Sequence, residues 1–113
     1  MTCSTIREIL TGAADKFGNQ DAVRYKIKKD TIETKSYMDL KKDSESFSNV
    51  LKILGETGSH IAVTGMTSYA WMVTYLGTVN SGRVAVPLDV SLPAEEMCAL
   101  IHRADVTVLV LDE

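Results

Sequence analysis

The sequence predicts an α/β fold, in which an N-terminal helix and a β-hairpin are followed by a Rossmann-like parallel β-α-β-α-β sheet. Two observations lead to this fold. Three short apolar runs, at residues 61–64, 84–87 and 106–111, are separated by helical patterns at 68–81 and 93–103. Strands that alternate with helices in this way form parallel sheets through right-handed crossovers. The first half of the chain instead shows helical and alternating patterns.

Length and composition indicate a single globular domain over residues 1–113. Hydrophobic residues make up 45% of the 113 residues and charged residues 24%, which is enough for one core. The net charge is −3 and the basic residues are scattered, so no nucleic-acid-binding patch is predicted. The densest basic cluster, Lys26, Lys28 and Lys29, falls in the predicted hairpin and is interpreted as a solvated turn.

The two cysteines, Cys3 and Cys98, form no CxxC pair, so the sequence signals neither a zinc site nor a disulfide framework. A reducing, cytoplasmic location is the simpler interpretation. We expect no signal sequence, because the first residues lack a basic segment followed by an apolar one. We also expect no transmembrane segment, because no apolar run approaches the ~20 residues that a membrane helix needs.

The first predicted helix covers residues 5–17. Thr5 and Glu8 fit a capping box, and Gly18 can end the helix. Its apolar face is formed by Ile6, Ile9, Leu10, Ala13, Ala14 and Phe17.

A β-hairpin follows. Apolar and polar residues alternate over residues 23–28, and a turn at Lys29 and Asp30 leads to a second alternating run over residues 32–36. We expect each strand to bury one side and to leave the other in water.

The second predicted helix covers residues 37–54. Ser36 and Asp39 offer its cap, and Gly55 its end. The stripe expected to face inward is Leu40, Phe47, Leu51 and Leu54.

The second half of the chain is more apolar. None of its three strand runs alternates cleanly, so each is expected to be buried on both faces. The helix at 68–81 is apolar nearly all round and is expected to be buried on most sides. Pro93 suits the first turn of the last helix, because its missing N–H needs no partner there.

The last strand run ends directly at Leu111, Asp112 and Glu113, whereas a parallel sheet normally continues into a covering helix. Together with the apolar helix at 68–81, this indicates a piece of a larger protein. We expect such a piece to leave apolar surface uncovered and to self-associate, for example through the edge strand at 106–111.

The usual catalytic motifs are absent from the sequence. There is no GxGxxG, Walker A or GxSxG pattern. The glycine-rich stretch at 55–59 precedes a strand, whereas a phosphate-binding loop follows one, so we interpret it as a helix stop and a turn. His60 and His102 have no second ligand at metal-binding spacing. Glu95 and Glu96 open a helix, where acids favour the dipole.

Three aromatic residues share the apolar helix. Tyr69, Trp71 and Tyr75 can line an acyl or aromatic pocket, or they can form an aromatic core. The core is the interpretation that we favour. We therefore assign no catalytic, cofactor-binding or metal-binding residue to this chain.

Two motifs carry a resemblance to a known family. Ser36-Tyr37-Met38-Asp39-Leu40 resembles an early Thr-Tyr-x-Glu-Leu motif, and residues 76–89, LGTVNSGRVAVPLD, resemble Leu-Gly-x-x-x-Ala-Gly-x-x-x-Val-Pro-Leu-Asp. Both motifs belong to the AMP-forming acyl-CoA synthetases, which are adenylate-forming ligases. The segments 21–23, 69–71 and 93–96 also match in order and spacing. The resemblance covers essentially the whole chain and is closest to long-chain fatty acid–CoA ligases.

The chain also departs mildly from the family pattern. The departures are Ser36 for Thr, Asp39 for Glu, Ser81 for Ala, Thr67 for Asn and Ala70 for Glu. They leave the substrate preference open.

The motif residues themselves have structural interpretations. We expect Gly82 to permit the turn after the helix and Pro87 to close the strand. Asp89 is expected to tie down the loop or to cap the next segment. Tyr37 and Leu40 are expected to anchor the second helix to the sheet.

The resemblance implies that the parent protein uses ATP and magnesium to activate a carboxylic acid, in the first instance a fatty acid, and transfers the acyl group to CoA. It also implies that the phosphate-binding loop, the metal site and the catalytic lysine lie outside these 113 residues. The chain would then be an N-terminal scaffold that is inactive alone, whose partner is the rest of the enzyme. The alternatives are an adenylation-domain piece of a peptide synthetase and a non-enzymatic interaction module with the same fold.

Overall fold

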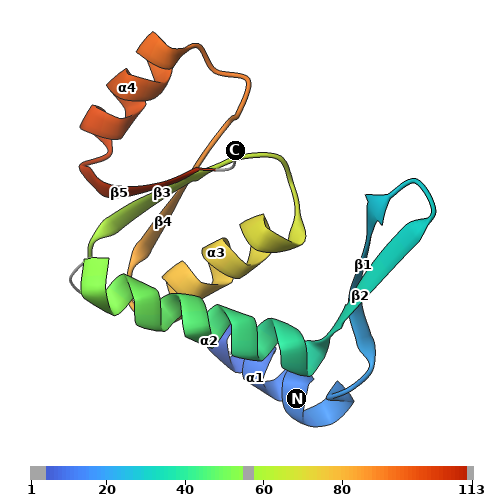
Figure 1. Cartoon of the computed structure of the whole chain (residues 1–113). Coiled ribbons are helices and arrows are strands. Elements are labelled where there is room, and N and C mark those ends of the chain that lie inside the picture. Colours follow the sequence, from blue (N-terminus) through green and yellow to red (C-terminus); the bar gives the residue numbers. More distant parts are fainter. Residues whose placement is uncertain (1–4, 55–57, 112–113) are drawn as a thin grey trace.

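The computed structural model describes residues 5–54 and 58–111 of the chain. Predictions that concern Cys3, Gly55 and residues 112–113 therefore lie outside the described residues. The elements in chain order are α1 (Ile6–Phe17), β1 (Asp21–Lys28), β2 (Thr31–Ser36), α2 (Tyr37–Leu54), β3 (His60–Thr64), α3 (Tyr69–Asn80), β4 (Val84–Leu88), α4 (Ala94–Arg103) and β5 (Val106–Leu111). Figure 1 shows this arrangement.

The predicted α/β fold is confirmed. β4, β3 and β5 form a parallel sheet in the order β4-β3-β5, and β1 and β2 form a separate antiparallel hairpin. The connection through α3 places β4 on one side of β3, and the connection through α4 returns to place β5 on the other. Right-handed crossovers in opposite directions put the two helices on opposite faces of the sheet, as Figure 1 shows.

The helix starts follow the predicted caps. At α1, the Glu8 backbone N–H donates to the Thr5 hydroxyl at 3.1 Å. At α2, the Asp39 N–H donates to the Ser36 hydroxyl and the Ser36 N–H donates to the Asp39 carboxylate, both at 3.0 Å. This reciprocal pair is a complete capping box. Gly18 ends α1 with a positive φ of 42°.

The two predicted apolar stripes are only partly buried. In α1, Leu10 and Ala14 are buried, but Ile6 is 42% and Ile9 53% exposed. In α2, the stripe is buried at Leu40 and Leu51 but not at Leu54, which is 57% exposed, because no described residue covers the last turn.

The prediction that α2 is anchored to the sheet is wrong. Helix α2 packs mainly against α3 and α1. The Tyr37 ring lies 5.4 Å from the Phe17 ring of α1, and the Tyr37 N–H donates to the Gln20 carbonyl. Tyr37 therefore fixes α2 to α1 and to the turn between α1 and β1.

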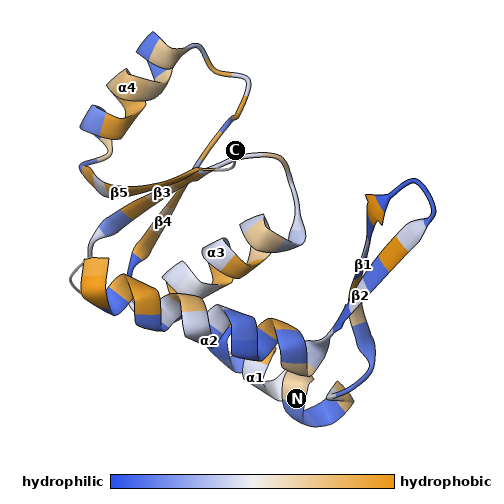
Figure 2. Cartoon of the chain, viewed as in Figure 1, coloured by the Kyte–Doolittle hydropathy of each residue, from blue (hydrophilic) through white to orange (hydrophobic). Residues whose placement is uncertain are grey.

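Only the central strand is buried as predicted. In β3, Ile61 and Ala62 are completely buried. The prediction of two buried faces is wrong for β4 and β5, where exposed positions recur, Leu109 and Leu111 among them. These strands lie at the edges of the sheet, and each has one strand neighbour among the described residues. Figure 2 shows apolar residues along all three strands.

Helix α3 buries small residues rather than the large apolar ones that were expected. Its buried positions are Thr74, Gly77 and Thr78, whereas Trp71 is half-buried. A Cβ atom at Gly77 would lie 2.8 Å from the Ser44 carbonyl oxygen of α2. Glycine thus permits a close crossing of α2 and α3, and the large side chains of α3 lie beside this contact.

Helix α4 begins one residue later than predicted. Pro93 is its N-cap, and its carbonyl accepts from the Met97 N–H at 3.0 Å. Helix α4 has no buried residue. The sheet face beneath it is therefore covered more thinly than the α3 face.

Candidate functional site

Ligands of open α/β sheets bind at the carboxyl ends of the strands, where the strand order reverses. In this sheet the order reverses between β3 and β5, because the chain steps from β3 to β4 and then crosses back. The carboxyl ends of β3 and β5 lie beside the start of α3. A ligand site is therefore expected at this edge.

A small hollow of about 110 Å³ occupies this edge. It is lined by Val63, Thr64, Gly65, Met66, Ser68, Ala70, Trp71, Thr74, Val110 and Leu111. Ligand pockets usually measure 300–1,000 Å³. The hollow can therefore hold one end of a ligand, while a larger ligand would need further walls.

Two polar features face this hollow. The Thr64 side chain is buried, and its hydroxyl has no hydrogen-bond partner among the described residues. Buried hydroxyls are normally paired, so this one marks a position where a ligand atom or a water can bind. The N-terminus of α3, capped by the Ser68 hydroxyl at 3.1 Å from the Trp71 nitrogen, adds a positive helix end.

The aromatic residues of α3 separate in the structure. Trp71 lines the hollow, and Tyr75 stacks on it with ring centres 5.5 Å apart. Tyr69 turns away, because its hydroxyl donates to the Asp43 carboxylate at 2.5 Å and its ring stacks on Tyr25. Burial, and then the bond to Asp43, raise the pKa of Tyr69. Neither a shared aromatic pocket nor a shared core describes all three residues.

The residues that carry the second motif have structural roles. Gly82 has a φ of 77° and its carbonyl accepts from the Gly58 N–H, so it forms the turn after α3 as predicted. Pro87 lies in the edge strand β4, which continues one residue further, to Leu88. The Asp89 carboxylate accepts from the Ser91 N–H and hydroxyl at 2.9 and 2.8 Å.

These bonds confirm that Asp89 ties down the loop after β4. The backbone bond from Ser91, followed by the hydroxyl bond, lowers the pKa of the Asp89 carboxyl. A carboxylate held in this way is an acceptor for its own loop rather than a general base.

The remaining sequence candidates do not gather at the hollow. The His60 Nδ1 atom lies 2.5 Å from the Ala104 carbonyl oxygen, which joins the start of β3 to the end of α4. Glu95 and Glu96 are exposed in the first turn of α4, His102 is exposed in its last turn, and Cys98 is exposed between them.

Among residues 5–54 and 58–111, no three His, Cys, Asp or Glu side chains could hold a metal ion together. Within the same residues, no helix is long and apolar enough to cross a membrane. Among the described residues, the carboxyl edge therefore offers shape, an unpaired hydroxyl and a positive helix end, and the hollow is lined by no acid–base pair. Sequence reasoning missed Thr64, because an unpaired hydroxyl depends on packing and leaves no trace in the sequence pattern.

Comparison with known proteins decides the family. The family model described as "AMP-binding enzyme" matches residues 10–113. The chain belongs to this family. The resemblance that rested on residues 36–40 and 76–89 is thereby confirmed at the level of the family, and family membership extends over nearly all of the described elements.

Two curated relatives bear on the chemistry of the family. A D-alanine–D-alanyl carrier protein ligase of Listeria monocytogenes is 34% identical over 80 residues, which are 69% of this chain and 16% of the relative. A long-chain-fatty-acid–CoA ligase of Mus musculus is 26% identical over 113 residues, which are 98% of this chain and 17% of the relative. The chain thus spans about a sixth of the length of these relatives.

Solved structures confirm the fold. The fatty acid AMP ligase from Legionella pneumophila superposes with a TM-score of 0.86 at 15% identity, over 97% of this chain and 20% of that one. The N-terminal subdomain of Klebsiella oxytoca NpsA gives 0.86 at 17% identity, over 98% of this chain and 28% of that one. At these identities the likeness concerns the fold alone.

Proposed function

We propose that this chain is the N-terminal scaffold of an adenylate-forming ligase that activates a carboxylic acid with ATP. The observation that carries the proposal is the family match over residues 10–113. The match runs from α1 to the end of β5, and in the structure α3 packs against β3 and β4 while α1 and α2 pack against α3. The chain contributes one wall of the acid or nucleotide site, and the rest of the enzyme supplies the other.

The chemistry of the described residues supports a scaffold role. Adenylation requires the phosphates of ATP to be neutralised while a carboxylate is aligned with the α-phosphorus. Over the part of the chain that the structure describes, the carboxyl edge carries Thr64, Ser68 and a helix end, with no cation lining the hollow and no cluster of metal-binding side chains. We therefore assign ATP and magnesium binding to the rest of the ligase.

Two acids are candidate substrates, and each is supported by a different relative. A fatty acid transferred to CoA is supported by the mouse ligase, whose match runs over 98% of the chain. D-alanine transferred to a carrier protein is supported by the Listeria ligase, which is more similar but over 69% of the chain. For either acid, the family resemblance implies the same first half-reaction, the formation of an acyl adenylate.

The test has two parts. The 113-residue chain alone should give ATP–pyrophosphate exchange equal to buffer with D-alanine, fatty acids and aromatic acids. The product of the complete reading frame that contains these residues should give exchange with at least one of these acids. Exchange by the chain alone, once contaminating ligase is excluded, would contradict the scaffold role; a complete product inactive with every acid would contradict the ligase.

A further inference from the structure

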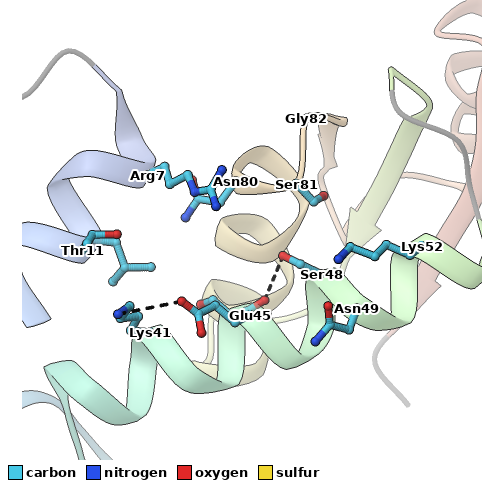
Figure 3. Close-up of a pocket in the computed structure, with 12 residues that line it drawn as sticks. Arg7, Thr11, Lys41, Glu45, Ser48, Asn49, Lys52, Asn80, Ser81 and Gly82 are labelled. Atoms are coloured by element: carbon cyan, nitrogen blue, oxygen red, sulfur yellow. Dashed lines mark hydrogen bonds and ion pairs between the residues drawn. The ribbon is translucent and has the colours of Figure 1, made fainter.

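A second and larger cavity, of about 540 Å³, lies between α1, α2 and α3. It is lined by Arg7, Leu10, Thr11, Lys41, Ser44, Glu45, Ser48, Asn49, Lys52, Asn80, Ser81 and Gly82. Because Ser81 and Gly82 precede β4, the cavity lies toward the amino end of that strand, away from the carboxyl edge. Its volume falls within the range of ligand pockets. Figure 3 shows its polar lining.

The charged groups of this lining are predominantly cationic. Arg7, Lys41 and Lys52 face one acid, Glu45, whose carboxylate lies 4.0 Å from the Lys41 ammonium group. Among the described residues, no ion pair involves Arg7 or Lys52. Figure 3 shows Arg7 reaching from α1 toward Asn80, and Lys52 reaching along α2 toward Ser48. Two cations on different walls are thus left without an acid.

The carbonyl groups at the end of α3 do not cancel this positive charge. The Ser81 carbonyl accepts from the Arg83 guanidinium at 3.1 Å, and the Gly82 carbonyl accepts from the Gly58 N–H. The Gly77 carbonyl accepts from the Ser48 hydroxyl at 2.7 Å. Because these acceptors are already paired within the protein, the negative end of the α3 dipole is partly compensated at the cavity.

A buried hydroxyl supplies an independent sign of a ligand. Ser44 is 2% exposed, lines the cavity, and has no hydrogen-bond partner for its hydroxyl among the described residues. An unsatisfied buried polar group costs free energy, so an unpaired buried hydroxyl indicates that a ligand or a water binds there. The neighbouring Ser48 hydroxyl already donates to two carbonyl groups, those of Ser44 and Gly77. The Ser44 hydroxyl, in contrast, is buried in the lining without a partner among the described residues.

We propose that this cavity binds a small phosphate-bearing ligand. Arg7 and Lys52 would bind its phosphate oxygens from opposite walls, because charge-assisted hydrogen bonds are the strongest that the lining offers. The Ser44 hydroxyl and the Asn49 and Asn80 amides suit the polar body of the ligand. The site does not depend on the proposed ligase activity, since it shares no residue with the hollow at the carboxyl edge.

The experiment titrates the isotope-labelled 113-residue chain with inorganic phosphate and, separately, with ribose 5-phosphate at constant ionic strength. Saturable amide shifts confined to the cavity lining are expected in at least one titration. Tighter binding of ribose 5-phosphate would assign a phosphate ester, and equal binding would assign the free anion. Shifts that fail to saturate, or that centre on the hairpin lysines, would overturn the proposal.

Three variants separate binding from folding. Lys52→Gln should weaken phosphate binding about tenfold, as the loss of one charge-assisted bond predicts. Lys42→Gln, an exposed change on the same helix outside the lining, is the matched control and should bind like the unmodified chain. Ser44→Ala should weaken binding without lowering the melting temperature, because it removes an unpaired hydroxyl. Unchanged binding by both Lys52→Gln and Ser44→Ala would also overturn the proposal.

Discussion

Each face of the parallel sheet is covered by one helix, but the two faces differ in how much further structure packs behind that helix. Helix α3 lies on one face and is itself backed by α2 and α1, so that the chain builds three layers there. Helix α4 covers the other face alone and buries none of its residues. The buried helix residues of the described chain consequently lie in α1, α2 and α3, whereas α4 contributes none. The comparison indicates which face carries the stability of this chain and which is open to a partner.

The largest effect should come from truncating the α3 side. Leu51 of α2 is completely buried, so Leu51→Ala should lower the free energy of unfolding by about 2–5 kcal/mol. Ile101→Ala, at a half-buried position of α4, should cost roughly 1 kcal/mol, because less apolar area leaves water there. Urea unfolding of both variants measures the difference. Equal losses would mean that the two faces stabilise the chain alike.

The second-largest loss of stability is expected at the crossing of α2 and α3. In Gly77→Ala the new Cβ would meet the Ser44 carbonyl oxygen at 2.8 Å and a Phe47 ring carbon at 2.9 Å, so the two helices must move apart. Overpacking of this kind costs about 1–3 kcal/mol, which exceeds the roughly 1 kcal/mol that alanine gains over glycine in a helix.

Thermal unfolding measures the net loss. The control is Ala99→Leu on the exposed face of α4, which should leave the melting temperature nearly unchanged. A stabilised Gly77→Ala variant would show that the two helices can accommodate a Cβ atom at their crossing.

A smaller effect on folding, but a clear one on association, is expected at the edge strand β5. Leu109 and Leu111 are 39% and 64% exposed on the edge strand β5. Exposed apolar edge strands pair with other chains, and a charge on the edge opposes this pairing. Leu109→Lys should therefore reduce self-association in light scattering at an almost constant unfolding free energy. Ile53→Lys, at an exposed site on α2 away from the sheet, is the control. A monomeric parent chain would contradict this expectation.

The smallest effect should be the pH dependence of the α2 cap. The hydrogen bond from the Ser36 N–H, followed by that from its hydroxyl group, lowers the pKa of Asp39 below its ordinary 3.8. Because the folded value is the lower one, the stabilisation is present above the unfolded pKa and is lost as the pH falls through the folded one.

Asp39→Asn should consequently be less stable than the parent chain at pH 7 and should approach it near pH 3. Urea midpoints at several pH values measure the two curves. Asp15→Asn is the control, because Asp15 has no role in the cap. Parallel curves for Asp39→Asn and the parent chain would show that the carboxylate charge does not stabilise the cap.

The sequence predicted the elements and their order, because those depend on local signals. The Thr5 and Ser36 caps, the Gly18 and Gly82 turns and the parallel strand runs all rest on residues within a few positions of each other. Burial was predicted less well, since it depends on which elements become neighbours. Leu54, and Leu109 and Leu111 of the edge strand β5, are apolar in sequence yet exposed in the structure.

The residues of the two cavities were also not predictable from the sequence. No pattern in the sequence distinguishes Ser44 or Thr64 from the other hydroxyl residues of this chain. Both become notable only when packing buries their hydroxyls without giving them an acceptor or a donor. The aromatic residues of α3 likewise share one helix in the sequence, but in the structure the Tyr69 hydroxyl donates to Asp43 while Trp71 and Tyr75 stack on each other.

The hairpin contacts the Tyr69 ring of α3 through Tyr25 and Lys35, and this arrangement has a practical consequence. Tyr25, midway along β1, stacks on Tyr69 with ring centres 5.9 Å apart, while Ile27 and Ile32 toward the tip are 53% and 63% exposed. Figure 1 shows the arm standing clear of the sheet. Residues 28–31 can therefore be lengthened or replaced without disturbing the core. The tip is therefore a suitable position for a fluorescent label or an affinity tag that leaves the sheet and both cavities unchanged.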